Sequence, residues 1–339
     1  MGNMNNLKEI EISLIDSKTK LDFIEIRGED SLNFLQSQFT NDLLELEKGD
    51  IDHQLTSYCN PKGRVIVLIK LLKISKNSYV LIMPKDIIEL VSKRLNIFKL
   101  RSKIFITSSN KKLQITAIWG KEIEIGVGKI AMINDLTIIR DSDCPTYGPR
   151  ALIICEKKII EEFEKSYTNS NNSINSLTLK ESEFWSGNVW IGKNHSESFI
   201  PQTLNLDLNG SISFSKGCYP GQEVVARTHY LGKVKKRVLL SQVEYNNENK
   251  MNIIIGEKVY LENYSDNSLS EIGEVVDFTS TTSDKTTGHL KFLLLFQCKV
   301  NELPSDKTTY KFRLGSTAGV KLDLLDLPYT VLESNEISK

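Results

Sequence analysis

The sequence lacks several features that mark particular classes of protein. No apolar run approaches the roughly 18 residues that a membrane-spanning helix needs. Lys and Arg together number 43, as do Asp and Glu, so the net charge is zero, which argues against a dedicated nucleic-acid coat but not against a local basic patch. The first 20 residues contain neither an apolar signal segment nor an Arg-rich presequence. A soluble, cytoplasmic protein without a membrane partner is therefore expected.

Cysteine is also scarce, and its spacing is uninformative for metal binding. The five cysteines are odd in number, lie far apart and form no CxxC pair: Cys59, Cys144, Cys155, Cys218 and Cys298. This pattern predicts neither a disulfide framework nor an intrinsic zinc or iron–sulfur site. It favours a reducing compartment.

The length and the hydrophobic pattern indicate more than one domain. At 339 residues the chain is too long for one typical core. Short strands and helices alternate up to about residue 237, and a helix is expected over 181–192 with Gly187 weakening its middle. From Val238 onwards the pattern consists of short strands only, which is typical of a small β-barrel.

The most informative stretch is 216–227, which reads KGCYPGQEVVAR. Pro220-Gly221 suits the central positions of a type II turn, because Pro fixes the first φ and Gly accepts a positive φ at the second. The residues from Gln222 can continue as a helix or as a strand. If they form a helix, its N-terminal dipole and the charge of Lys216 would both favour a Cys218 thiolate. The alternative is that Cys218 is a small buried filler behind the turn.

Three segments together resemble the YgfZ family, the folate-binding relatives of the glycine-cleavage T protein. The resemblance depends first on Lys216-Gly217-Cys218-Tyr219 with Gly221-Gln222-Glu223. Two earlier segments are similar to other family motifs and occur in the same order: Phe34–Leu43, which contains Thr40-Asn41-Asp42, and Tyr58–Arg64, which contains Asn60-Pro61-Lys62-Gly63.

The resemblance implies an α+β fold of the T-protein, or aminomethyltransferase, type. Two ferredoxin-like halves would surround a central pocket within residues 1–237 and form the folate-binding domain. Residues 238–328 would form the C-terminal β-barrel, and 329–339 a tail. The implied cofactor is tetrahydrofolate or a derivative.

The resemblance also implies partners and a role. The role is assembly or repair of iron–sulfur clusters in client proteins, including enzymes that modify tRNA. A direct contact with tRNA is left open. The basic cluster Lys233, Lys235, Lys236 and Arg237 could steer a phosphate-bearing partner, or it could be a plain exposed strand edge.

The residues that match the motifs are the candidate site. Cys218 would be the functional thiol, Lys216 and Arg227 would supply positive charge, and Gln222 and Glu223 would hydrogen-bond the loop or the ligand. Gly217, Tyr219 and Gly221 complete the motif. The candidates for folate binding are Asn41, Asp42, Tyr58, Lys62, Arg64 and Trp190. Asn41 and Asp42 could instead cap a helix end, and Trp190 could belong to the core rather than stack on a pterin.

Two departures from the family pattern affect the expected chemistry. In the T protein the second motif leads into a strand that carries the catalytic acid, whereas Val65–Ile69 contains no carboxylate. We therefore do not expect aminomethyl transfer by the T-protein route, and a folate-dependent one-carbon transferase or a pure scaffold remain the alternatives. The family also has an Arg-Ile-x-x-Gly segment, and in the corresponding Asn188-Val189-Trp190-Ile191-Gly192 the arginine position holds Asn188.

Overall fold

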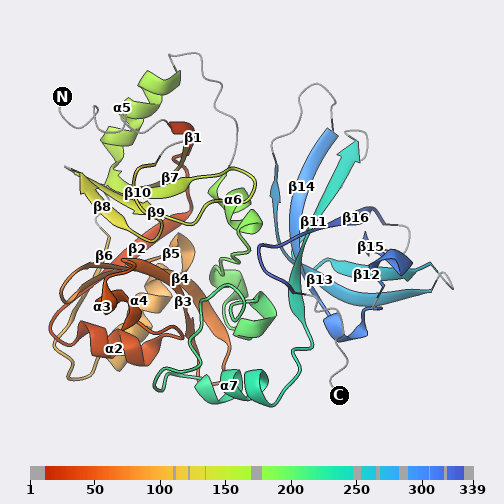
Figure 1. The fold of residues 1–339 in the computed structure, drawn as a ribbon, viewed down its shortest axis with the longest axis horizontal. Helices are drawn as coiled ribbons and strands as arrows, with labels where there is room; N and C mark the ends of the chain where they lie inside the picture. Colours follow the sequence, from red (N-terminus) through yellow and green to blue (C-terminus); the bar gives the residue numbers. More distant parts are fainter. Residues whose placement is uncertain are drawn as a thin grey trace. The chain divides into compact units, whose positions relative to one another are not determined.

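The structure is a computed structural model that describes residues 12–109, 112–120, 123–133, 135–168, 178–246, 253–264, 268–281, 289–304, 306–316 and 319–331. The chain forms two compact units (Figure 1). The N-terminal unit comprises Met1–Leu179, Val189–Ile200 and Gly210–Ala226, and the C-terminal unit comprises Lys180–Asn188, Pro201–Asn209 and Arg227–Lys339.

The first antiparallel sheet of the N-terminal unit has the strand order β3-β4-β5-β2-β6. Its strands are β2 (Leu21–Arg27), β3 (His53–Cys59), β4 (Val65–Ser75), β5 (Ser78–Pro84) and β6 (Phe105–Ser108). The interior strand β4 is buried on both faces along Val65–Leu72, which explains why its sequence is a continuous apolar run rather than an alternating one.

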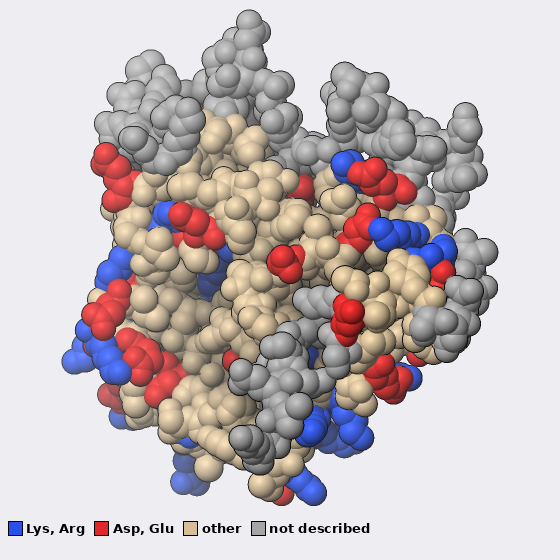
Figure 2. Space-filling view, turned by 45° about the vertical axis from the view of Figure 1, so that its right-hand side comes forward, with Lys and Arg blue, Asp and Glu red and all other residues tan. Residues whose placement is uncertain are grey.

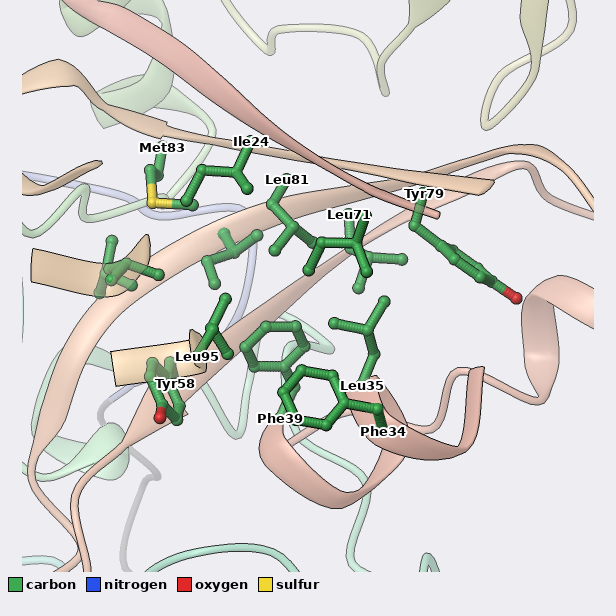
Figure 3. Close-up of a cluster of buried hydrophobic side chains, with 14 of the residues drawn as sticks. Ile24, Phe34, Leu35, Phe39, Tyr58, Leu71, Tyr79, Leu81, Met83 and Leu95 are labelled. Carbon is green, nitrogen blue, oxygen red and sulfur yellow. The ribbon is translucent and has the colours of Figure 1, made fainter. Parts of the chain in front are cut away.

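Three helices cover one face of this sheet: α2 (Ser31–Gln38), α3 (Glu45–Lys48) and α4 (Ile88–Phe98), the last preceded by the 3-10 turn η1 (Lys85–Ile87). In α4 the buried residues Ile88, Val91 and Leu95 recur every three or four positions and so share one side of the helix. Figure 3 shows Leu95 of α4 and the aromatic rings of Phe34 and Phe39 facing the sheet. This core fixes the ends of α2 and β3, where two of the sequence motifs lie.

The second antiparallel sheet has the order β1-β7-β10-β9-β8. Its strands are β1 (Ile12–Asp16), β7 (Leu113–Gly120), β8 (Ile130–Ile133), β9 (Leu136–Arg140) and β10 (Arg150–Glu156), and α5 (Lys157–Thr168) follows them. Cys155 of β10 is completely buried, as its Ile-Ile-Cys context indicates. The two sheets share an apolar cluster that includes Leu72 and Ile82 from the first and Ile139 and Leu152 from the second.

A buried charged group joins the same two sheets. Lys70 of β4 donates a hydrogen bond to Asp141, which follows β9, and both side chains are almost fully buried. His53 of β3 contacts the carbonyl oxygen of Arg140 at 3.0 Å through Nε2, which also lies 4.0 Å from Asp141 Oδ1. Burial alone would raise the pKa of Asp141, but the nearby charges of Lys70 and Arg150 bring it down to about 2.

The helix predicted over 181–192 is shorter in the structure. Helix α6 spans Leu179–Trp185, and the backbone turns at Gly187, whose φ is 71°. A Cβ at Gly187 would lie 2.5 Å from Cε1 of Tyr329, and the Tyr329 hydroxyl donates to the Gly187 carbonyl at 2.7 Å. Glycine therefore ends this helix, and the segment continues through the 3-10 turns η2 (Lys193–His195) and η3 (Pro201–Leu204).

The C-terminal unit contains the predicted β-barrel, with the closed order β11-β14-β13-β12-β15-β16 (Figure 1). Its strands are β11 (Arg237–Asn246), β12 (Lys258–Asn263), β13 (Leu269–Ser280), β14 (His289–Cys298), β15 (Tyr310–Leu314) and β16 (Lys321–Leu325), with the 3-10 turns η4 (Val300–Glu302) and η5 (Lys307–Thr309). Strand β16 was not expected from the sequence. It pairs with both β15 and β11 and so closes the barrel.

In the predicted tail, the Tyr329 hydroxyl group donates a hydrogen bond to the Gly187 carbonyl, and residues 332–339 lie outside the described part of the chain.

On the face drawn in Figure 2, Lys and Arg side chains lie beside Asp and Glu side chains, in keeping with the zero net charge. Within the described ranges, none of the helices is both long and apolar enough to span a membrane.

Candidate functional site

The turn predicted at Pro220-Gly221 is present. Gly221 has a φ of 82°, and the Gln222 amide donates to the Tyr219 carbonyl at 3.2 Å, which closes a four-residue turn of type II character. Helix α7 (Gln222–Tyr230) follows at once, so the helical alternative holds for this segment. The Gln222 side chain reaches back to the Lys216 carbonyl at 3.4 Å.

Cys218 is exposed, whereas two residues close to it in the motif, Lys216 and Tyr219, are buried. Lys216 and Tyr219 are both buried to more than nine-tenths, whereas Gly217 and Cys218 face solvent. The interpretation of Cys218 as a buried filler is therefore wrong. The segment is anchored on either side of the thiol, which it presents at the surface.

The ammonium group of Lys216 holds the first and third motifs together. It donates to the carbonyl oxygens of Gln36 and Phe39 at 2.6 Å and of Asn41 at 3.0 Å. These carbonyls lie at the end of α2, where the helix leaves its last acceptors unpaired. Nζ also lies 5.4 Å from the centroid of the Tyr219 ring. Burial lowers the pKa of Lys216 to about 8. The expected role of this charge beside Cys218 stays a prediction, because the contacts of the ammonium are to α2.

The polar residues after α2 are used in structural hydrogen bonds. The side-chain Nδ2 of Asn41 donates to the backbone carbonyls of Leu55 and Gly210, and its Oδ1 accepts from the backbone amide of Asp42. Asp42 Oδ1 accepts from the Gln36 side chain at 2.8 Å and from the Leu44 amide at 3.0 Å. These contacts favour the capping interpretation of both residues. A contact of either residue with folate remains a prediction.

The second motif packs directly against the third. Asn60 closes its own turn by accepting from the amides of Lys62 and Arg64 through Oδ1, and its carbonyl accepts from the Gly63 amide. A Cβ at Gly221 would lie 2.5 Å from the Asn60 carbonyl oxygen and 2.7 Å from Gly63 Cα. The two glycine turns thus touch through their backbones. All three motifs form one cluster within the N-terminal unit.

A charged pair that the sequence did not reveal lies beside the second motif. Tyr58 is buried with its ring edge-on to Phe39, and the charge of Arg94 of α4 acts on its hydroxyl group. Burial raises the pKa of Tyr58, and Arg94 offsets part of that rise. Arg94 also pairs with Glu197 at 3.0 Å, and Glu197 has a φ of 64°. Nothing in the local sequence connects these three distant positions.

The other candidates differ in exposure. Lys62 and Arg64 are exposed, and Arg64 Nη1 donates to the Ser198 carbonyl at 2.8 Å. Glu223 and Arg227 are exposed on α7. Trp190 is half-buried and lies in the irregular segment after α6, not on a helix. Among the residues that the structure describes, no group of three or more His, Cys, Asp or Glu is arranged to hold a metal ion.

The exposures predict a selective thiol titration. In the native protein, 5,5′-dithiobis(2-nitrobenzoic acid) should react rapidly with one thiol, that of Cys218. The other four should react only after unfolding, because all four are buried, and burial raises the pKa of Cys59, Cys155 and Cys298 to about 12. The Cys218→Ala variant should show no fast phase. A fast phase that persists in this variant would contradict the assignment.

Several curated proteins are similar to this chain, although no protein-family model matches it. An uncharacterized protein of Haemophilus influenzae is 26% identical over 325 residues, which cover 94% of this chain and 98% of that protein. The tRNA-modifying protein YgfZ of Colwellia psychrerythraea is 29% identical over 65% of this chain and 69% of its own length. The YgfZ of Vibrio atlanticus is 28% identical over 63% of this chain and 65% of its own length, so these alignments span about two thirds of the YgfZ proteins. The predicted resemblance to the YgfZ family is confirmed.

The fold has a solved counterpart. The glycine cleavage system aminomethyltransferase T from Bartonella henselae superposes with a TM-score of 0.62 at 11% sequence identity, covering 98% of this chain and 89% of that protein. At this identity the likeness concerns the fold alone. It confirms the predicted aminomethyltransferase-like α+β fold with a C-terminal β-barrel.

Proposed function

Because the chain is a homologue of the YgfZ proteins, we propose that it binds a tetrahydrofolate and supports tRNA modification through iron–sulfur client enzymes. The observation that carries the proposal is the convergence of the three motifs around an exposed Cys218. Four cysteines of the chain are buried, and the one in the motif is presented from a loop fixed on both sides. Such a thiol is suited to transient contact with a macromolecular client.

The candidate site contains the kinds of side chain that a folate needs. A folate carries a flat pterin ring and a carboxylate tail, so it needs an aromatic face and cations. Trp190 offers a half-buried ring, and Lys62 and Arg64 offer exposed cations next to the turn that packs on Gly221. In this proposal the folate occupies the central pocket that the family resemblance implies, without obligatory turnover, and this chain's residues bind and orient it.

In the client step, Cys218 would lose its proton to solvent and bind a client's iron in place of one of the iron's ligands, or it would attack a client disulfide, forming a mixed disulfide and releasing one client thiol. Lys216 and Tyr219 keep the loop in place, and Gln222 ties the start of α7 to the Lys216 carbonyl. Exposed Glu223 and Arg227 are positioned to meet the client rather than the core. In this proposal the iron–sulfur cluster belongs to the client.

Two measurements on wild type and Cys218→Ala separate these claims. By calorimetry, both proteins should bind tetrahydrofolate with micromolar affinity. In a bacterial strain that lacks its own homologue, wild type should restore the iron–sulfur-dependent thiolation of tRNA, and Cys218→Ala should restore little or none. Absence of folate binding by wild type would refute the folate part. Full rescue by the variant would refute the thiol part.

The fold likeness also favours a second candidate, a folate-dependent one-carbon transferase. Its difficulty is chemical. The start of β4, which should carry the catalytic acid, is Val65–Ile69, a buried apolar stretch. A transferase would need another proton donor or acceptor. Turnover of methylene-tetrahydrofolate with an added amine or thiol acceptor would establish this candidate.

A further inference from the structure

An exposed apolar and basic surface occupies the end of α4 and the start of β6, away from the motif residues in sequence. Four large apolar side chains are exposed there: Ile97 at 68%, Phe98 at 46%, Leu100 at 85% and Phe105 at 74%. We call these four residues, together with Lys93, Lys99 and Arg101, the α4–β6 patch. Exposed apolar side chains that cluster in this way commonly mark a binding surface.

The charge of this region has one sign. From Leu90 to Lys121 the sequence contains no Asp or Glu, but it contains Lys93, Arg94, Lys99, Arg101, Lys103, Lys111, Lys112 and Lys121. Within the described residues, Lys93, Lys99 and Arg101 form no ion pair with a carboxylate. By contrast, Arg94 pairs with Glu197, and Lys103 pairs with Glu29. In a chain with zero net charge, such a segment provides a local site for an anionic partner.

Backbone contacts hold the loop of the patch, residues 99–104, against the rest of the unit. The Ser102 amide donates to the Lys99 carbonyl at 2.9 Å, and the Lys103 amide donates to Asp30 at 2.7 Å. Ile104 is buried beneath the patch, and a Cβ at Gly28 would lie 2.1 Å from the Lys103 carbonyl oxygen. The loop therefore rests directly on the backbone of Gly28, which fixes the positions of the exposed groups.

Leu100 is held in an unfavourable conformation at the tip of this loop. Its φ is 46°, in the left-handed region that bulky residues avoid, and its side chain is the most exposed of the four. Beside it, Lys99 Nζ lies 5.9 Å from the centroid of the Phe105 ring. A cation next to an exposed ring face is the arrangement that binds a base together with its phosphate.

We propose that the α4–β6 patch binds an unpaired segment of RNA. Phe98 and Phe105 would stack on bases, Lys93, Lys99 and Arg101 would contact phosphates, and Leu100 and Ile97 would pack against base or ribose edges. An anionic lipid surface or an acidic protein could also attract cations and apolar groups, but neither needs ring faces beside the cations. The assignment rests on the proposed link to tRNA modification and gives that link a direct RNA contact.

Binding should be measured on the full-length protein by fluorescence anisotropy, using a labelled single-stranded oligoribonucleotide and an unmodified tRNA transcript. Phe98→Ala/Phe105→Ala should weaken single-strand binding about a hundredfold, since stacking of one base is worth roughly tenfold or more per ring. Lys99→Gln/Arg101→Gln should reduce the slope of log K against log salt concentration by about 1.4, from roughly 0.7 per phosphate contact. All four positions have exposed or partly exposed side chains, so thermal unfolding should change little.

Matched controls are Lys76→Gln and Met132→Ala, which remove an exposed cation and an exposed apolar side chain elsewhere in the same unit. Both should bind RNA like wild type. Three outcomes would overturn the assignment: no RNA binding by wild type, RNA binding that none of the patch variants weakens, or binding to phosphatidylglycerol vesicles without binding to RNA. Tetrahydrofolate affinity, measured on the same variants, should not change. Loss of folate binding in wild type with RNA binding intact would refute the proposed folate function but not this surface.

Discussion

Replacing Gly221 with alanine should destabilise the N-terminal unit by about 3 kcal/mol or more, and Gly217→Ala in the same loop should change its stability very little. At Gly221 the φ of 82° disfavours any side chain, and a Cβ would lie within 2.7 Å of backbone atoms of Asn60 and Gly63. Backbone cannot move aside as a flexible side chain can. At Gly217 a Cβ would meet no atom within 4 Å.

Chemical denaturation of both variants, followed by Trp fluorescence, tests this contrast. Gly221→Ala should also make Cys59 reactive to thiol reagents before global unfolding, because the second motif would lose its contact with the third. Gly217→Ala controls for the loss of a flexible glycine next to Cys218. Equal stability of the two variants would show that the contact between the motifs does not depend on Gly221.

Much of this site could be predicted because its signals are local. A Pro-Gly pair specifies its turn through the φ values that the two residues accept, and the structure has that turn. The family resemblance of the three motifs implied the fold class, and the strand pattern after residue 238 predicted the barrel. In each case a few neighbouring residues carry the information.

The target of Lys216 could not be predicted, because it lies far away in the chain. The acceptors are the backbone carbonyls of Gln36, Phe39 and Asn41. Because every residue has a backbone carbonyl, the sequence does not mark which of them accept a hydrogen bond. The same holds for Arg94, which meets Tyr58 and Glu197 only after α4 packs on the sheet. Long-range polar contacts of this kind become visible only when the tertiary structure is known.

The end of α6 shows how a helix boundary changes a motif assignment. The sequence allowed a helix to Gly192, which places Asn188 at the family's arginine position. The structure ends the helix earlier, at a glycine with positive φ, Gly187. If Gly187 is the glycine of the Arg-Ile-x-x-Gly pattern, Glu183 takes the arginine position, and the glycine alone matches within 183–187. Glu183 is buried and accepts a hydrogen bond from the Asn188 side chain at 2.8 Å. In either register the arginine is absent from this chain.

The buried pair between the two sheets gives the second large expected effect. Asp141→Asn should lower the free energy of unfolding by about 3–5 kcal/mol, because it leaves the Lys70 ammonium buried without its counter-charge. The double variant Lys70→Met/Asp141→Leu should recover much of this loss, since a buried ion pair can often be replaced by apolar side chains of similar volume. Glu45→Gln, which breaks the exposed pair with Lys48, is the control and should have almost no effect.

The dependence of stability on pH identifies the charge itself as the cause. The folded pKa of Asp141 is about 2, below its usual value, so its contribution is present above about pH 4 and is lost as the pH falls towards 2. Burial lowers the pKa of His53, so protonation of His53 also destabilises the folded protein, but this loss begins at about pH 6.5 and grows as the pH falls. Between pH 4 and 2 wild type should therefore lose stability more steeply than Asp141→Asn. Between pH 7 and 5 the variant should lose stability at least as steeply as wild type, because the charge of Asp141 raises the pKa of His53 and its removal lowers that pKa further. Parallel curves over the whole range would mean that the variant is destabilised by altered packing and not by the loss of the ion pair.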